Sequence, residues 1–202
     1  MHIAAFAFAV LVATAPPSTF DDQKKAAITV PRLASTIAAI VGVCPDGLFA
    51  EELAECQQNV GKAAKGFAGK KVYLNLGGGL EQFLTFESKT GDRAKLVWAP
   101  IVDLGNGLAM TLARPQKLSD AGTVVVARQP FEGFSDPDLL DSDLQRAIKT
   151  GQVGIELIGT FGKPWELKGK DTVRGVAFEM TSARFFHTRS GKVLVEVSAR
   201  QR

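Results

Sequence analysis

Residues 153–197, VGIELIGTFGKPWELKGKDTVRGVAFEMTSARFFHTRSGKVLVEV, are the stretch that decides the fold of this chain. Apolar side chains stand at alternate positions at its start, at Val153, Ile155 and Leu157, and this spacing is typical of a strand with one buried face. The Gly-Lys-Pro sequence at 162–164 predicts a turn after that strand. A second strand then carries Val176, Phe178 and Met180.

The alternation changes its phase inside the second strand. Val176 and Phe178 share one face of a regular strand. Ala183 and Phe185 follow the opposite parity, as does His187. One extra residue near Thr181–Ser182, which would form a β-bulge, explains the change. After a turn at 190–191, a last strand carries Val193, Val195 and Val197.

The preceding part of the chain, from Lys71 to Val126, also alternates between apolar and polar residues. Asn106–Gly107 is a strong signal for a two-residue hairpin turn. The short turns between the strands predict a meander. A helix over about 136–150 should follow, because acidic residues begin it and Thr150–Gly151 ends it. The predicted strands cover 72–76, 84–86, 94–104, 108–112 and 124–126.

Two apolar stripes at helical spacing precede these strands and predict two short helices. The segment Pro45-Asp46-Gly47 joins them, and Asp46 is suited to cap the second helix. We therefore expect a helical hairpin within residues 16–70. The stripes consist of Leu33, Ile37, Ile40 and Cys44, and of Phe49, Leu53, Cys56, Val60, Ala63 and Phe67.

Cys44 and Cys56 lie on these stripes and predict a disulfide, because an even pair of cysteines in an exported protein is most often bridged. The bridge requires Cα atoms about 4.4–6.8 Å apart. Since Cys56 lies about two turns beyond the loop, the second helix must start late or the loop must fold back. Two buried free thiols are the alternative.

Taken together, these elements predict an α+β chain. About nine strands and three helices are expected, in which an N-terminal helical hairpin precedes a mainly antiparallel β-barrel or β-sandwich with one intervening helix. We assign residues 71–202 to one β-rich domain. An oligonucleotide/oligosaccharide-binding-type barrel over part of the chain is a further option.

The N-terminal residues predict an export signal. Residues 3–15, IAAFAFAVLVATA, are too few for a bilayer span of about 20 residues but match the apolar region of a secretory signal. We expect residues 1–15 to form it, with cleavage near 13–19. No Lys or Arg precedes the run and Pro16 follows it, so a start further upstream, a buried N-terminal helix and an uncleaved anchor are alternatives. The mature protein should be periplasmic or extracellular, with no transmembrane anchor.

The composition excludes several classes of protein. The chain has 202 residues, of which 46% are hydrophobic and 22% charged, unlike a disordered tail, a coiled coil or a collagen. Its net charge of +3 is too low for a dedicated nucleic-acid binder. It has two histidines, and only His187 lies outside the predicted signal, so the common zinc sites, which need two or three histidines, are excluded. We expect no metal and no cofactor.

Four residues are candidates for ligand binding: Trp98, Trp165, Arg184 and His187. Either tryptophan could line a pocket, and Arg184 belongs to a basic group that could meet an anion. The sequence has no G-x-S-x-G elbow, P-loop or dinucleotide-binding loop, so we predict no catalytic residue. Whether the four candidates share a cavity cannot be read from their spacing.

The leading hypothesis is a non-catalytic exported protein that binds a small ligand or a protein partner. One alternative is a hydrolase that uses His187 with a distant serine and aspartate. Another is an oligonucleotide-type barrel that binds nucleic acid or a different polyanion.

Overall fold

The computed structural model describes residues 19–44, 49–78, 84–88, 94–98, 101–112, 115–122, 124–125, 129–130 and 142–198. The predicted signal, the loop at Pro45–Gly47 and the predicted helix start at 135–138 lie outside these residues. None of the helices in these residues combines the length and the apolar composition of a membrane span.

The chain is mixed α+β, as predicted, and is built around one long hairpin of β10 (Val153–Lys168) and β11 (Thr172–His187). The turn lies beyond Lys168, where the Gly169 N–H donates to the Asp171 carbonyl at 3.1 Å. The predicted turn at 162–164 is therefore wrong. Pro164 is tolerated inside β10 because the neighbouring strand on that side pairs only with Ile155–Gly159, so Pro164 lies on an edge.

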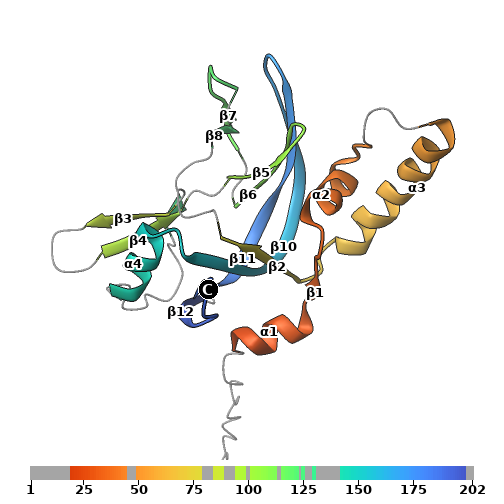
Figure 1. Cartoon of the computed structure of the whole chain (residues 1–202). Coiled ribbons are helices and arrows are strands. Elements are labelled where there is room, and N and C mark those ends of the chain that lie inside the picture. The colour runs from red at the N-terminus through yellow and green to blue at the C-terminus, as the bar shows by residue number, and fades with distance from the viewer. Residues whose placement is uncertain are drawn as a thin grey trace, which may run out of the picture.

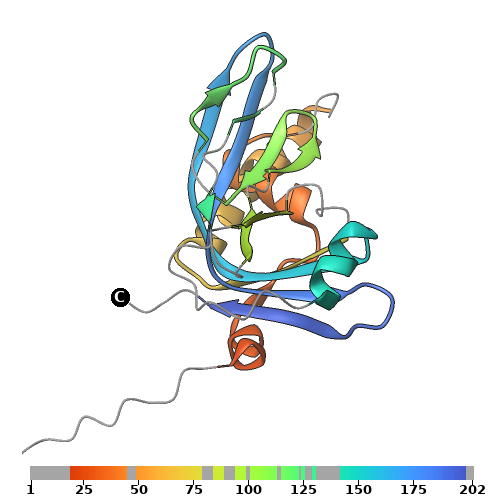
Figure 2. The same ribbon diagram turned by 90° about the vertical axis from the view of Figure 1, so that its left-hand side faces the viewer.

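The predicted bulge in β11 is confirmed. Ile158 pairs with Ser182, but the next residue, Gly159, pairs with Met180, which leaves Thr181 as the extra residue. The Thr181 hydroxyl donates to the Ile158 carbonyl at 3.0 Å. Bulges bend the strands that contain them, and Figure 2 shows both long strands curving through this region.

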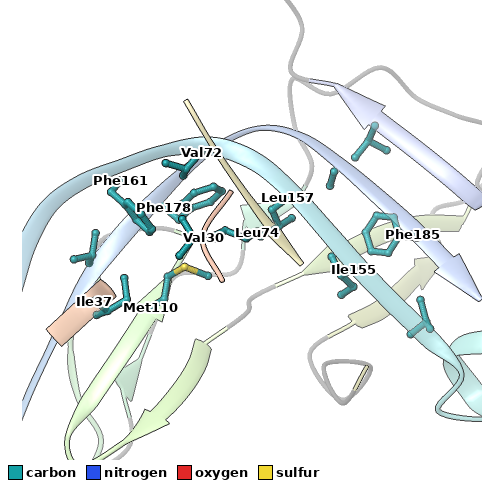
Figure 3. Packing of buried hydrophobic residues seen from close by; sticks show 14 of the residues in the cluster. Val30, Ile37, Val72, Leu74, Met110, Ile155, Leu157, Phe161, Phe178 and Phe185 are labelled. Carbon is teal, nitrogen blue, oxygen red and sulfur yellow. The ribbon is translucent and has the colours of Figure 1, made fainter. Parts of the chain in front are cut away.

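The main hydrophobic core fills the inner side of this bend (Figure 3). Because of the bulge, both halves of β11 direct apolar side chains into this core. Val176 and Phe178 come from the first half, and Ala183 and Phe185 from the second. The helices α2 (Leu33–Val41) and α4 (Ser142–Lys149) cover the core through Ile37 and Ala147. α4 lies inside the bend (Figure 2).

A seven-stranded, mainly antiparallel sheet forms around the hairpin. β6 pairs with the first half of β11 and β12 with the second half, on either side of the bulge. β1–β2 and β6–β11 are parallel, while the other described pairs are antiparallel. The flanking strands are β1 (Ile28–Thr29), β2 (Val72–Gly77), β5 (Ile101–Gly105), β6 (Leu108–Thr111) and β12 (Val193–Ser198).

The predicted meander is wrong. The apolar run at 94–104 divides into β4 (Ala94–Trp98) and β5, which belong to different sheets. No closed barrel is found among the described strands, so the prediction of a barrel or sandwich is not confirmed. The small sheets contain β3 (Leu84–Ser88), β4 and β9 (Gln129–Pro130) in one, and β7 (Lys117–Leu118) and β8 (Val124–Val125) in the other.

The predicted disulfide is present. Cys44 and Cys56 are bridged with their Cα atoms 6.0 Å apart, and no free cysteine is found. The prediction that Cys44 lies on the first helix is wrong, because α2 ends at Val41 and Gly42 follows it in the left-handed conformation (φ +81°). The chain beyond α2 therefore reaches Cys56, within α3 (Ala50–Phe67). α2 lies between α3 and the sheet (Figure 1).

Candidate functional site

The structure places the predicted ligand-binding residues apart. His187 is the last residue of β11, at the open end of the long hairpin, whereas Trp165 lies near its turn. Arg184 and His187 are three positions apart in one strand, so their side chains leave opposite faces. The structure describes the backbone of Trp98 but not its side chain. The three described candidates therefore share no cavity.

Arg184 lies on the outer face of the sheet, where it helps to hold α1 (Phe20–Ala26). Its guanidinium pairs with Asp21 at 2.9 Å and Glu196 at 2.7 Å, and it lies 3.5 Å from the Glu156 carboxylate. Burial alone would lower the pKa of Arg184, but the hydrogen bonds to Glu196 and Asp21 raise it above its ordinary value. These contacts favour a structural role for Arg184.

Glu156 is the centre of the polar cluster beneath α1. Its side chain is 10% exposed and accepts hydrogen bonds from the Lys24 ammonium at 2.7 Å and from the Tyr73 hydroxyl. Burial, and then the bond to Glu156, raise the pKa of Tyr73. Phe20 packs beside this cluster against Tyr73 and Ile158. α1 is thus held by one small apolar contact and several ionic ones.

The sequence prediction missed α1 and its cluster. The signal for the helix is a capping box, in which Asp22 N–H donates to Thr19 Oγ1 at 3.2 Å and Thr19 N–H donates to the Asp22 carboxylate at 3.3 Å. The Thr-x-x-Asp spacing is visible in the sequence. The partner of Glu156 is not, because Lys24 lies 132 residues away along the chain.

A first cavity, the hairpin pocket, lies between the β5–β6 hairpin and the segment that leads into β8, and has a volume of about 490 Å³. Asp103 is the one charged residue among its described lining residues, and its Oδ1 accepts the Gly105 N–H at 2.9 Å. The apolar walls are Ile101, Leu108, Ala109, Val124 and Val173. Gly105, Asn106, Gly107, Ala121 and Gly122 complete the lining.

Trp165 lies beneath the hairpin pocket. It is 5% exposed and packs with Ala109 and Val124, both of which line the pocket. Across the strand pair, Gly175 leaves room for the indole ring, since a Cβ atom there would lie 2.4 Å from Trp165. Trp165 therefore supports the pocket without lining it.

A second cavity, the His187 pocket, lies between α4, the residues that lead into β10, the end of β11 and the start of β12, and has a volume of about 210 Å³. Its lining contains no serine or cysteine among the described residues, and the Thr150 hydroxyl donates to the Arg146 carbonyl of α4 at 2.9 Å. The lining residues are Asp143, Arg146, Ala147, Thr150, Gln152, His187, Lys192 and Leu194.

No metal centre is apparent in the described part of the chain, because no group of three or more His, Cys, Asp or Glu side chains lies close enough to hold an ion. The two cavities described above are the candidate sites. The chain matches no family model, no curated protein and no solved structure.

Proposed function

We propose that this chain is a non-catalytic, exported binding protein that takes a small ligand with both apolar and polar groups in the hairpin pocket. The observation that carries the proposal is the cavity of about 490 Å³, whose described lining residues form apolar walls and include one charged side chain. Small-molecule sites typically occupy about 300–1,000 Å³ and combine apolar walls with a few polar groups. The Asp103 carboxylate favours a ligand with a cationic or hydrogen-bond-donating group.

The geometry of the pocket supports preorganised binding. The Asp103 carboxylate is held by the Gly105 N–H, so its position does not have to be fixed by the ligand. Ala109 and Val124 are buried against Trp165, which keeps that wall in place. A preformed site binds more tightly because less conformational entropy is lost on binding.

A matched pair of probes tests the charge preference. 2-Phenylethylamine and phenylacetate have similar shapes and opposite charges, and we expect the amine to bind with a Kd below about 1 mM and the acid more weakly. An Asp103→Asn variant keeps an acceptor for the Gly105 N–H but removes the charge. It should weaken binding of the amine about three- to fivefold. Isothermal titration calorimetry measures both constants.

A pair of tryptophan variants tests whether the hairpin pocket is the binding site. Ala121 lines the pocket, so Ala121→Trp should fill it and abolish binding of the amine. Ala54→Trp places the same side chain on an exposed position of α3 and should leave binding unchanged. Equal affinity of the two variants for the amine would refute the hairpin pocket as the site.

Export is the other part of the proposal. The Cys44–Cys56 disulfide supports it, because disulfides persist mainly in oxidising compartments. We expect the mass of the protein from the exported fraction to show that cleavage has occurred between residues 13 and 19. An intact Met1 in that fraction would contradict cleavage of the predicted signal.

The two alternatives stay hypotheses. The hydrolase would need a serine near His187, and none lines the His187 pocket within the described residues. The polyanion-binding barrel would need a closed barrel, which the described strands do not form. A small-ligand binding protein is therefore the function that the cavities favour.

A further inference from the structure

We propose that the His187 pocket binds a small oxyanion, such as inorganic phosphate or a carboxylate. This site is separate from the hairpin pocket, at the other end of the long hairpin. Its volume of about 210 Å³ suits a ligand of a few heavy atoms, and four different elements or their ends contribute to it.

Three side chains bring hydrogen-bond donors to the pocket without making a hydrogen bond of their own in the described structure: Arg146, Gln152 and His187. The Arg146 guanidinium lies 3.8 Å from the Asp143 carboxylate, which is too long for a hydrogen bond. Nδ1 of His187 is buried and has no partner. A guanidinium close to an amide and an imidazole is a donor set that suits an oxyanion.

The described side chains that line the pocket carry a net positive charge, although Asp143 is among them. The Lys192 ammonium donates to Asp143 Oδ2 at 2.9 Å and is the main reason why the pKa of Asp143 lies below its ordinary value. Arg146 and His187 lower this pKa further. Among the described lining residues, Arg146 and Lys192 thus face one carboxylate, and the charges that favour the ionised carboxylate also favour a bound anion.

The C-terminal end of α4 opposes an anion only weakly. A helix C-terminus carries partial negative charge on carbonyls that lack partners. Here the Ala147 carbonyl accepts the Gln152 N–H at 2.8 Å, and the Arg146 carbonyl accepts the Thr150 N–H at 3.0 Å. These bonds reduce the repulsion that α4 would otherwise exert.

Backbone hydrogen bonds fix His187 and Lys192, which both line the pocket, relative to each other. His187 N–H donates to the Lys192 carbonyl at 2.8 Å, and Gly191 N–H donates to the His187 carbonyl at 2.8 Å. The imidazole and the ammonium are therefore attached to one tight turn between β11 and β12. Little reorganisation is needed before a ligand can contact both.

The test uses the full chain with the substitution His2→Gln, in which His187 is the only histidine. Inorganic phosphate is added at constant ionic strength, and the NMR signal of the imidazole Cε1–H is followed. We expect a saturable shift with a Kd of about 0.1–5 mM. Saturation by phosphate alone supports a phosphate-type ligand, and saturation by acetate as well supports a carboxylate. A shift that matches a chloride titration and does not saturate would overturn the proposal.

Variants test whether the named donors bind the anion. Arg146→Ala should weaken phosphate binding at least about fivefold, whereas Arg174→Ala, whose side chain pairs with Glu166 outside the pocket, should leave it within about twofold. Asp143→Asn should bind phosphate at least as tightly as the parent chain, since it removes a competing anion. Unchanged phosphate binding in Arg146→Ala, or weaker phosphate binding in Asp143→Asn, would show that Arg146 and Lys192 do not hold the ligand.

Discussion

A Gly175→Ala variant is expected to lose about 3 kcal/mol or more of its free energy of unfolding, since overpacking at this site has no room to relax. A Cβ atom at Gly175 would lie 2.0 Å from the Ala109 carbonyl oxygen, which belongs to the backbone of β6. It would also meet the Trp165 ring at 2.4 Å. The added methyl group must therefore separate β6 from β11 or expel the indole. Urea denaturation measures the loss.

Gly66→Ala is the matched control for this substitution. Gly66 lies in α3, where a Cβ atom would meet nothing within 4 Å, so the same change should stabilise the helix by up to about 1 kcal/mol. If Gly175→Ala unfolded at the same urea concentration as the parent chain, β6 and Trp165 could not approach Gly175 as closely as the structure shows.

A Glu156→Ala variant is expected to lose about 3 kcal/mol of stability and to release α1 from the sheet, because removing one member of a buried ionic cluster leaves its partners uncompensated. Lys24 and Tyr73 both donate to this carboxylate, and Arg184 lies beside it. Hydrogen exchange should show that the amides of α1 lose protection. Urea denaturation gives the change in stability.

Glu166→Ala provides the comparison. Glu166 also accepts from an arginine, Arg174, at 2.8 Å and lies 3.4 Å from Lys168, but its side chain is 38% exposed. Exposed ion pairs contribute little, so this variant should change stability only slightly and leave α1 protected. Equal losses of stability in Glu156→Ala and Glu166→Ala would show that burial does not increase the contribution of the Glu156 carboxylate to stability.

The strands could be predicted where side-chain alternation is strong. Val153, Ile155 and Leu157 face the core as their spacing predicts, and the change of phase before Ala183 locates the bulge at Thr181. The turn at 162–164 was predicted wrongly because Gly-Lys-Pro also fits a strand with a free edge. That edge depends on how far β2 extends along β10.

The candidate site could be predicted only in part. His187 does line a pocket, but its neighbours Arg146 and Lys192 come from other elements. The hairpin signal at Asn106–Gly107 is confirmed as the turn between β5 and β6, although nothing in its local sequence shows that the turn borders a cavity. Pockets form between segments that are distant in the chain, and local spacing carries no information about their approach.

The sequence by itself determined the features that depend on near neighbours: the α+β class, the two faces of the long strands, the bulge and the paired cysteines. Tertiary structure alone decided which strands pair, how α1 covers Glu156 and where the two pockets lie. The physical reason is how far apart along the chain the interacting residues lie. Periodicity reports the direction of each side chain along its own element, whereas pairing and cavities depend on the packing of distant elements against each other.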